Sequence, residues 1–157
     1  MQTVTLTAGH KKLELLAGSW SGEDTCHPSP WNPELHHAIG RANCRVALGG
    51  FAVIGDYEQE RDGKVVFNGH GVYTYDAGDD SYVCHWFDSM GLNPMEFRGK
   101  LVDDVLTLKI HDEQFGHCRL VYDLKRVADG HYGFRMDGSQ DGKTWRPSLE
   151  GEYRRQD

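Results

Sequence analysis

Short stretches in which apolar and polar residues alternate follow one another along most of the chain, and turn residues separate them. Asp-Gly pairs are frequent between these stretches, and they favour tight hairpins because both residues tolerate a positive φ. A side-chain period of two over four to thirteen residues is typical of β-strands. The pattern predicts about ten strands, at residues 19–26, 38–48, 51–61, 64–76, 81–88, 95–101, 105–111, 118–127, 131–139 and 143–154.

The order of these strands favours an all-β fold. A near-continuous meander with short links is antiparallel, and it closes on itself because closure removes exposed edges. We therefore expect one up-and-down antiparallel β-barrel covering residues 1–157, with a two-sheet sandwich as the alternative. Residues 8–17, which carry Leu13, Leu15 and Leu16, are expected to form a short helix before the first strand.

The longest link is residues 27–37, with the sequence HPSPWNPELHH. Its three prolines exclude regular structure, so it must be a loop or an irregular cover. Two interpretations remain open for it. It is either a lid over the barrel interior or a connection that merely caps one end.

The first expected strand begins with LLAGSWSGEDT, and its Gly18-x-Trp20 resembles the signature of lipocalins and their calycin relatives. The resemblance implies a tryptophan that closes the bottom of the barrel and packs against a basic residue from the last strands. Arg154 or Arg155 could be that residue, through cation-π stacking.

A second resemblance covers nearly the whole chain. The segments HKKLELLAGSWSGE, LGGFAVIGDYEQ, YDAGDDSYVCHWFDSMG and SQDGKTWRPSLEGEYRR are similar to the uncharacterised bacterial family called domain of unknown function 1579. This resemblance implies a calycin-like barrel without an established activity. It therefore informs the fold much more than the function.

The net charge limits the classes of partner that are expected, and the cysteines bear on the compartment. The formal net charge is -7, and Lys and Arg are scattered, so neither nucleic acid nor an anionic membrane surface is an expected partner. The N-terminal residues lack the pattern of an export signal, and a cytoplasmic location is expected. The four cysteines stand singly, without a C-x-x-C pair, and are expected to be free thiols. A homodimer remains possible.

The period of two also assigns inward faces to several strands. We expect these inward side chains in five groups: Trp20, Gly22, Asp24 and Cys26; Cys44, Val46 and Leu48; Leu106, Leu108 and Ile110; Cys118, Leu120, Tyr122 and Leu124; and Tyr132, Phe134 and Met136. The cysteines among them are expected to act as small apolar residues.

The hairpin over residues 64–88 is ambiguous, because both of its faces carry aromatic residues. One face has Gly69, Gly71, Tyr73, Tyr75, Tyr82, Cys84 and Trp86, and the other has His70, Val72, His85 and Phe87. If His70 and His85 faced inward, they could ligate haem or a metal. The haem-binding nitrobindins also begin with a Gly-x-Trp-x-Gly strand, but they use a histidine near the C-terminus, and this chain has none after His131.

No known catalytic motif occurs. The chain lacks a G-x-S-x-G, a phosphate loop and a G-x-G-x-x-G, so no catalytic residue, metal or cofactor is assigned. Asp88 is the best candidate for a functional carboxylate. An isomerase or hydrolase that uses Asp88 and His85 is the alternative, but strict alternation places these two residues on opposite faces.

The leading hypothesis is a barrel that binds a small, largely apolar molecule in its interior. A structural or interaction module without a ligand is the competing hypothesis from another class. The expected ligand-binding residues comprise aromatic lining and polar contacts: Trp20, Tyr57, Trp86, Phe97, Tyr122 and Phe134 for the lining, and His85, Asp88 and Arg135 for the contacts.

Overall fold

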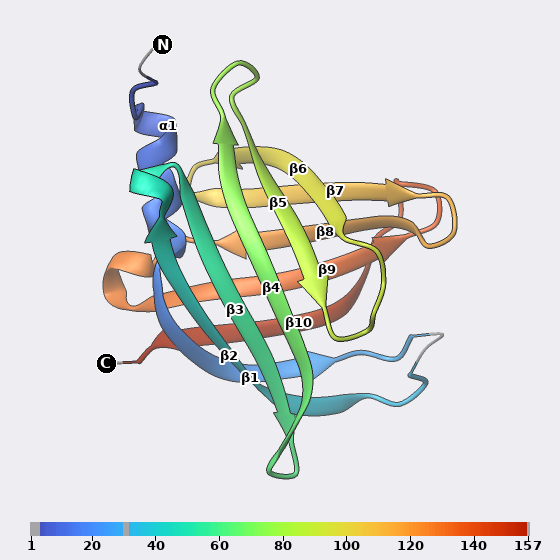
Figure 1. The fold of residues 1–157 in the computed structure, drawn as a ribbon. Helices are drawn as coiled ribbons and strands as arrows, with labels where there is room; N and C mark the ends of the chain where they lie inside the picture. Colours follow the sequence, from blue (N-terminus) through green and yellow to red (C-terminus); the bar gives the residue numbers. More distant parts are fainter. Residues whose placement is uncertain (1–3, 30–31, 157) are drawn as a thin grey trace.

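Ten antiparallel strands close into one barrel in the computed structural model, which describes residues 4–29 and 32–156 (Figure 1). Each strand pairs with its neighbours in sequence, and β1 pairs with β10 to complete the ring. This topology confirms the expected up-and-down barrel and excludes the sandwich. The elements are α1 (Ala8–Lys11), η1 (Lys12–Leu16), β1 (Gly18–Cys26), β2 (His36–Ala47), η2 (Leu48–Gly50), β3 (Ala52–Arg61), β4 (Lys64–Asp76), β5 (Ser81–Asp88), β6 (Met95–Val102), β7 (Val105–Asp112), β8 (Gly116–Asp123), η3 (Val127–Asp129), β9 (His131–Ser139) and β10 (Arg146–Arg155).

The turns follow the chemistry expected from the sequence. Asp103 and Asp104 form a two-residue link between β6 and β7, and their φ angles are 50° and 59°. Two consecutive positive φ angles give the turn the twist that antiparallel strands need. The strands β4, β5 and β9 have the bounds that the alternation predicts. The expected N-terminal helix is present, although only four of its residues are α-helical before it tightens into a 3₁₀ segment.

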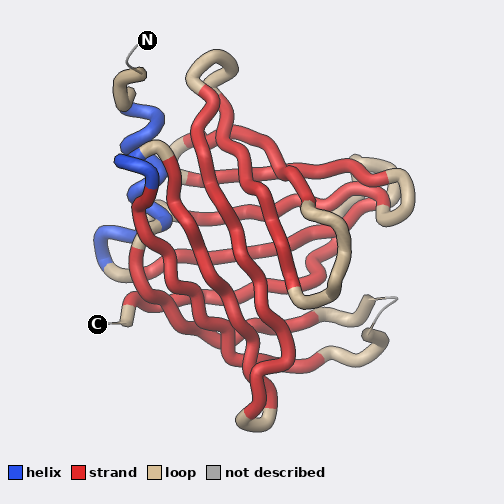
Figure 2. Tube along the Cα trace, viewed as in Figure 1, coloured by secondary structure: helices blue, strands red, loops and turns tan. Residues whose placement is uncertain are grey.

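The barrel has two different ends. We call the end where β1, β3, β5, β7 and β9 begin the near end, and the end where they finish the far end. Figure 2 shows the helical segments gathered on the near side and loops alone on the far side. No helix among the described residues has the length and apolar character needed to cross a membrane.

A dry core fills the near end. Trp20 is 2% exposed, and the guanidinium of Arg155 lies 4.4 Å from its ring centroid. The expected stacking with a terminal arginine is therefore present, with Arg155 as the partner. Leu13 and Leu16 of η1 are buried against this core, and the Tyr82 hydroxyl donates a hydrogen bond to the Gly9 carbonyl at 2.8 Å. Helix and barrel are thus packed as one unit.

The expected inward faces are found on β1, β7, β8 and β9, but the prediction for residues 44–48 is wrong at Leu48, while Val46 keeps the inward phase opposite the buried Val53 and is exposed near the end of β2. Val46 is 43% exposed and Leu48 is 69% exposed. Leu48 lies in η2 with a φ of 53°, so the strand period has already ended there. The residues Pro30 and Trp31 of the expected lid lie outside the described part of the chain, and the described rest of 27–35 forms no helix or strand.

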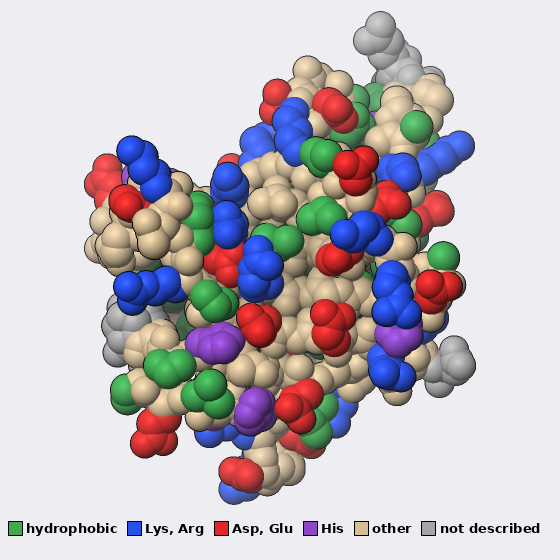
Figure 3. Space-filling model, turned by 180° about the vertical axis from the view of Figure 1, so that it is seen from behind, with side chains coloured by type: hydrophobic (Ala, Val, Ile, Leu, Met, Phe, Trp, Pro, Cys, Tyr) green, Lys and Arg blue, Asp and Glu red, His purple; other side chains and the backbone are tan. Residues whose placement is uncertain are grey.

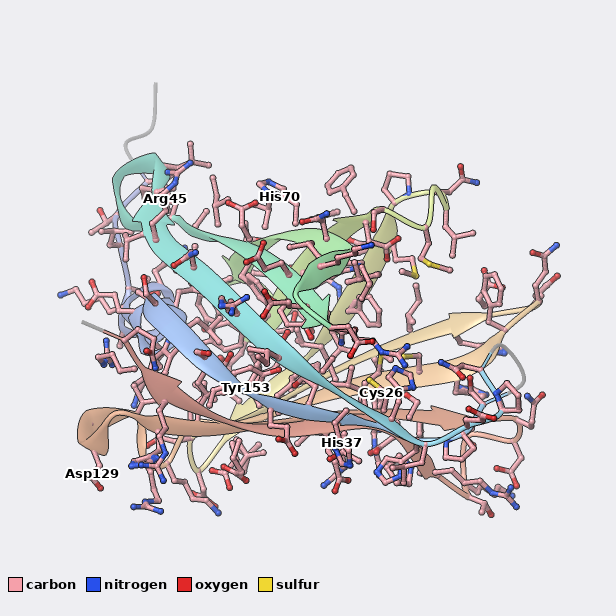
Figure 4. All side chains as sticks on the ribbon, turned by 90° about the horizontal axis from the view of Figure 1, so that it is seen from below. Cys26, His37, Arg45, His70, Asp129 and Tyr153 are labelled. Carbon is pink, nitrogen blue, oxygen red and sulfur yellow. The ribbon has the colours of Figure 1, made fainter. Side chains whose placement is uncertain are left out.

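The structure also decides the face of the hairpin formed by β4 and β5. Tyr73, Tyr82 and Cys84 are buried in the core, whereas His70 and His85 are exposed on the outer wall. Figure 4, which looks from below, shows His70 at the outer margin of the strands. The hypothesis that these two histidines ligate a metal or haem in the interior is therefore wrong.

Candidate functional site

The far half of the interior is lined by side chains that remain partly accessible. They come from six strands, point inward by alternation and pack against the core. We call this set the far lining; it comprises Tyr57, Trp86, Met95, Ile110, Cys118, Phe134 and Met136. Since strands wall off the outside, the surface that these side chains retain borders the barrel interior and its far mouth.

A pair of tyrosines forms the floor below the far lining. Tyr73 of β4 and Tyr122 of β8 reach across the barrel, and their hydroxyl oxygens are 2.7 Å apart. Both are buried, and burial raises the pKa of each phenol well above its ordinary value. The hydrogen bond satisfies two polar groups that would otherwise be stranded in the apolar core. The floor separates the dry near end from the accessible far half.

One carboxyl group is buried beside the far lining. Asp24 of β1 is 0% exposed and accepts hydrogen bonds from the hydroxyls of Tyr57 and Tyr153. The Gln59 amide donates to the Tyr57 hydroxyl at 2.7 Å and reaches Asp24 at 3.5 Å. These four residues, from β1, β3 and β10, form what we call the Asp24 cluster. It is the polar corner of an otherwise aromatic and aliphatic interior.

Two glycines on the neighbouring strands make room for the Asp24 carboxyl. Gly151 lies opposite Asp24 in the register of β10, and Gly40 lies on β2. A Cβ atom at Gly151 would be 2.5 Å from Asp24 Oδ1, and one at Gly40 would be 2.7 Å from the Tyr153 hydroxyl and would overlap the carboxyl. Any side chain at either position would therefore displace the cluster.

Burial dominates the electrostatics of the Asp24 cluster. Desolvation raises the pKa of Asp24, and it outweighs the opposing effect of the hydrogen bonds from Tyr153, Tyr57 and Gln59. Desolvation, followed by the charges of its neighbours, also raises the pKa values of Tyr57 and Tyr153, so both phenols stay protonated donors. In the part of the chain that the structure describes, no Lys, Arg or His forms an ion pair with Asp24.

The outer wall differs from this interior in its charge. Figure 3, which shows the molecule from behind, has Lys and Arg side chains interspersed with Asp and Glu. On that wall Asp137 accepts from Arg119 at 2.7 Å and from Arg135 at 2.9 Å. The carboxylate of Asp137 outside the barrel is thus held by two arginines, whereas the carboxyl of Asp24 inside is held by neutral donors.

Trp86 and Asp88 meet at the far mouth. The Trp86 indole donates to Asp88 Oδ2 at 2.9 Å, while Asp88 Oδ1 accepts the Met90 backbone N–H at 2.9 Å. The ring of Trp86 lies against Gly69, where a Cβ atom would overlap it. Asp88 therefore orients an aromatic wall and the following turn, which is the structural role expected of an Asp before a turn.

The expected ligand-binding residues divide between the two faces. Trp20, Tyr57, Trp86, Phe97, Tyr122 and Phe134 all lie in the interior. His85 and Arg135 lie on the outer wall, where His85 is 3.5 Å from Glu96 and Arg135 bonds Asp137. Both were expected, with Asp88, as polar contacts to a ligand. The outward position of Arg135 follows from the inward phase of Phe134 and Met136, whereas the face of His85 was left open by the sequence. The register of β4 and β5 runs without a bulge, so His85 and Asp88 stay on opposite faces and share no catalytic site.

The thiols belong to the interior. All four cysteines are unpaired, and Cys84 is completely buried. Burial raises the pKa of Cys84 to about 12 and the pKa values of Cys44 and Cys118 to about 11. Such thiols are weak nucleophiles and weak metal ligands at neutral pH. Residues 4–29 and 32–156 contain no group of three or more His, Cys, Asp or Glu side chains arranged to hold a metal ion.

A surface hollow of about 430 Å³ lies on the outer wall of β2 to β5. Its lining includes the Asp56–His70 pair, whose atoms are 2.7 Å apart, and the exposed ring of Phe87. Arg41 at its edge pairs with Glu58 at 3.5 Å and Glu60 at 3.1 Å. Arg41 and the Asp56–His70 pair are thus already engaged in ion pairs on this wall, and the amide side chains of Asn43 and Asn68 also line the hollow.

The sequence interpretation missed most of the Asp24 cluster. Asp24 was expected to face inward, but a lone Asp on a strand carries no motif. Tyr153 and Gln59 join it only because β1 pairs with β10 and with β2 in a particular register. One signal in the sequence could have indicated the cluster: Asp24 is in phase with Trp20 and Cys26, and a charged group that faces an apolar interior needs hydrogen-bond or charge partners.

Comparisons with known proteins agree with this fold. The model of the family "Protein of unknown function (DUF1579)" matches residues 5–155. No curated protein matches the chain. A solved structure, that of Rv2717c from M. tuberculosis, is similar with a TM-score of 0.72 at 14% sequence identity, covering 98% of this chain and 100% of that one. At this identity the likeness shows the fold alone. The family match spans nearly the entire chain, and the protein therefore belongs to the DUF1579 family.

Proposed function

We propose that the protein uses the far half of its barrel to bind one small, largely apolar molecule. The observation that carries the proposal is the accessible surface of the far lining. Phe134, Trp86 and Met136 point inward and yet remain partly exposed, whereas Val53 and Leu108 elsewhere in the interior are 0% exposed. An apolar surface left open inside a barrel gains free energy when a ligand covers it.

The size of the barrel supports this proposal. Barrel diameter grows roughly linearly with strand number, and eight strands already enclose enough space for one small ligand. Ten strands surround the interior here. The lining is mainly aromatic and aliphatic with a few polar groups, which is the usual composition of small-molecule pockets.

The unpaired cysteines support a cytosolic place of action, which we propose as well. Four thiols that lie within one barrel and form no disulfide are compatible with a reducing compartment. Their raised pKa values keep them in the thiol form, so they act as apolar lining.

Titration with the neutral fluorescent dye Nile red tests the proposal. We expect saturable, stoichiometric binding to the native protein, and we expect Cys118→Phe, which fills the far lining, to weaken it by about tenfold or more. Val121→Phe introduces the same ring on the outer face of the same strand, and it should leave the affinity unchanged. A wild-type protein that does not bind the dye, or a Cys118→Phe variant that binds it normally, would show that the interior is packed or unused.

A further inference from the structure

The Asp24 cluster points to the chemistry of the ligand's polar group. We propose that the ligand carries a hydrogen-bond-donating, cationic head group, an amine, which the Asp24 cluster binds, with Gln59 holding that place in the free protein. The inference rests on the proposed function, because it concerns the polar end of the same interior.

The first argument is charge. Asp24 is 0% exposed, and the groups that bond it are two phenols and one amide, all neutral. A buried carboxylate without a counter-charge is costly, and it either takes up a proton or binds a cation. An ammonium group supplies both the positive charge and the donor hydrogens that a carboxylate accepts. A carboxylate head group would instead place two like charges in a desolvated site.

The second argument is the reach of Asp24 into the interior. Burial is the largest cause of the raised pKa values of Tyr57, Tyr153, Tyr132 and Cys26, which surround Asp24 on four strands, and the charge of Asp24 raises each of them further. Arg61 is the one cation whose charge affects any of these four pKa values, and it lowers that of Cys26. Its side chain is exposed and lies at the far end of β3. Arg155 covers Trp20 at the near end. No Lys, Arg or His among the described residues pairs with Asp24, so its ionised form presents an uncompensated negative charge to a ligand in the far half.

The third argument is the position of Gln59. Its amide nitrogen is 2.7 Å from the Tyr57 hydroxyl and 3.5 Å from Asp24, the latter at the limit of a hydrogen bond. Gln59 is partly exposed and lies two residues from the end of β3, so its flexible side chain can turn toward the far mouth. An incoming ammonium group would then donate to the same two oxygens. The Asp24 carboxyl stays in place during this exchange, because it keeps its hydrogen bonds from Tyr57 and Tyr153 and its space beside Gly40 and Gly151.

Competition among three ligands of equal chain length tests the inference. Decylamine, decanol and decanoate are titrated against bound Nile red at neutral pH, where the amine is charged. We expect decylamine to displace the dye at a concentration at least about tenfold lower than decanoate, with decanol between them. Asp24→Asn should abolish this preference, while Asp56→Asn, which removes a carboxyl from the outer face beside Tyr57, should retain it.

Each outcome bears on one claim. If all three compounds compete equally, or if Asp24→Asn keeps the preference for the amine, the inference is wrong and the apolar binding site stands. If none of the three displaces the dye, the proposed function fails as well. Gln59→Ala decides the matter if Asp24→Asn does not fold: it should bind decylamine at least as tightly as the wild type, and a loss of amine binding would show that Gln59 is not a placeholder.

Discussion

The two ends of the barrel are built from the same alternation and yet have different properties. At the near end, α1 and η1 cover the opening, and Trp20, Leu13 and Tyr82 are buried beneath them. At the far end, the described residues around the mouth form loops without a helix, and inward side chains such as Trp86 and Phe134 keep accessible surface. The comparison teaches that strand alternation decides which residues face inward, whereas the covering elements decide whether the interior is sealed.

The largest expected effect concerns the sealed end. Trp20→Ala removes an indole that is 2% exposed, lies beneath the Arg155 guanidinium and meets the Tyr132 ring edge to face. We expect a loss of about 3–5 kcal/mol in the free energy of unfolding, measured by urea denaturation. Trp86→Ala at the open end should cost at least about 1 kcal/mol less, because that ring is already partly solvated. Equal losses would remove the distinction between the two ends.

A second substitution tests the room made for Asp24. Gly40→Ala places a methyl group against the carboxyl and 2.7 Å from the Tyr153 hydroxyl, and it should destabilise the fold by about 1–3 kcal/mol. Gly138→Ala on β9 is the matched control. A Cβ atom there would meet only the His117 carbonyl oxygen, at 3.9 Å, so thermal unfolding should show no loss. If Gly40→Ala left the stability of the fold unchanged, the side chains of the Asp24 cluster could shift to admit a methyl group at little cost.

The pH dependence of stability tests the burial of Asp24. Its pKa in the folded state is raised above the ordinary 3.8, so the folded protein keeps this proton to a higher pH than the unfolded chain does. The contribution of Asp24 therefore falls as the pH rises from about 3.8 through the raised pKa, and it is constant above that. The Asp24→Asn variant has no carboxyl group at this position, so its stability lacks this dependence on pH.

Urea unfolding of the wild type and Asp24→Asn across this pH window is the corresponding measurement. The wild type should lose stability relative to the variant as the pH rises. Since burial raises the pKa values of Tyr57 and Tyr153, neither phenol titrates in the same window. If the wild type gained stability relative to the Asp24→Asn variant as the pH rises, the hydrogen bonds to Asp24 would outweigh the effect of its desolvation.

The smallest expected effect is on thiol reactivity. Because burial raises the pKa values of Cys44 and Cys118 to about 11 and that of Cys84 to about 12, the native protein should react slowly with a thiol reagent. Cys118, which is partly exposed in the far lining, should react before the completely buried Cys84. Rapid labelling of Cys84 in the native state would contradict the packed core.

Alternation in the sequence was sufficient for most of the fold. It predicted ten strands, their inward faces on β1, β7, β8 and β9, and the burial of Trp20. It could not orient the hairpin of β4 and β5, because aromatic residues occur on both of its faces. Only the burial of Tyr73, Tyr82 and Cys84 inside the closed ring settles that question.

The candidate site was less predictable, and for a physical reason. Apolar lining residues such as Phe97 and Tyr122 follow the period of two and were found. Arg135 was chosen for its chemistry against that period, and His85 was chosen on a hairpin whose inward face the period left open; both lie outside. The Asp24 cluster depends on contacts between residues 24, 57 and 153, which lie on three different strands. A period along one strand contains no information about such contacts.

The methionine methyl groups offer the most direct test of the account. Met95 and Met136 belong to the far lining, whereas Met90 is 66% exposed on the loop after β5. In a protein labelled with ¹³C at the methionine methyls, saturation with decylamine should shift the Met95 and Met136 resonances most and Met90 least. Shifts confined to Met90, or no shift at all, would contradict a ligand site in the far half of the barrel.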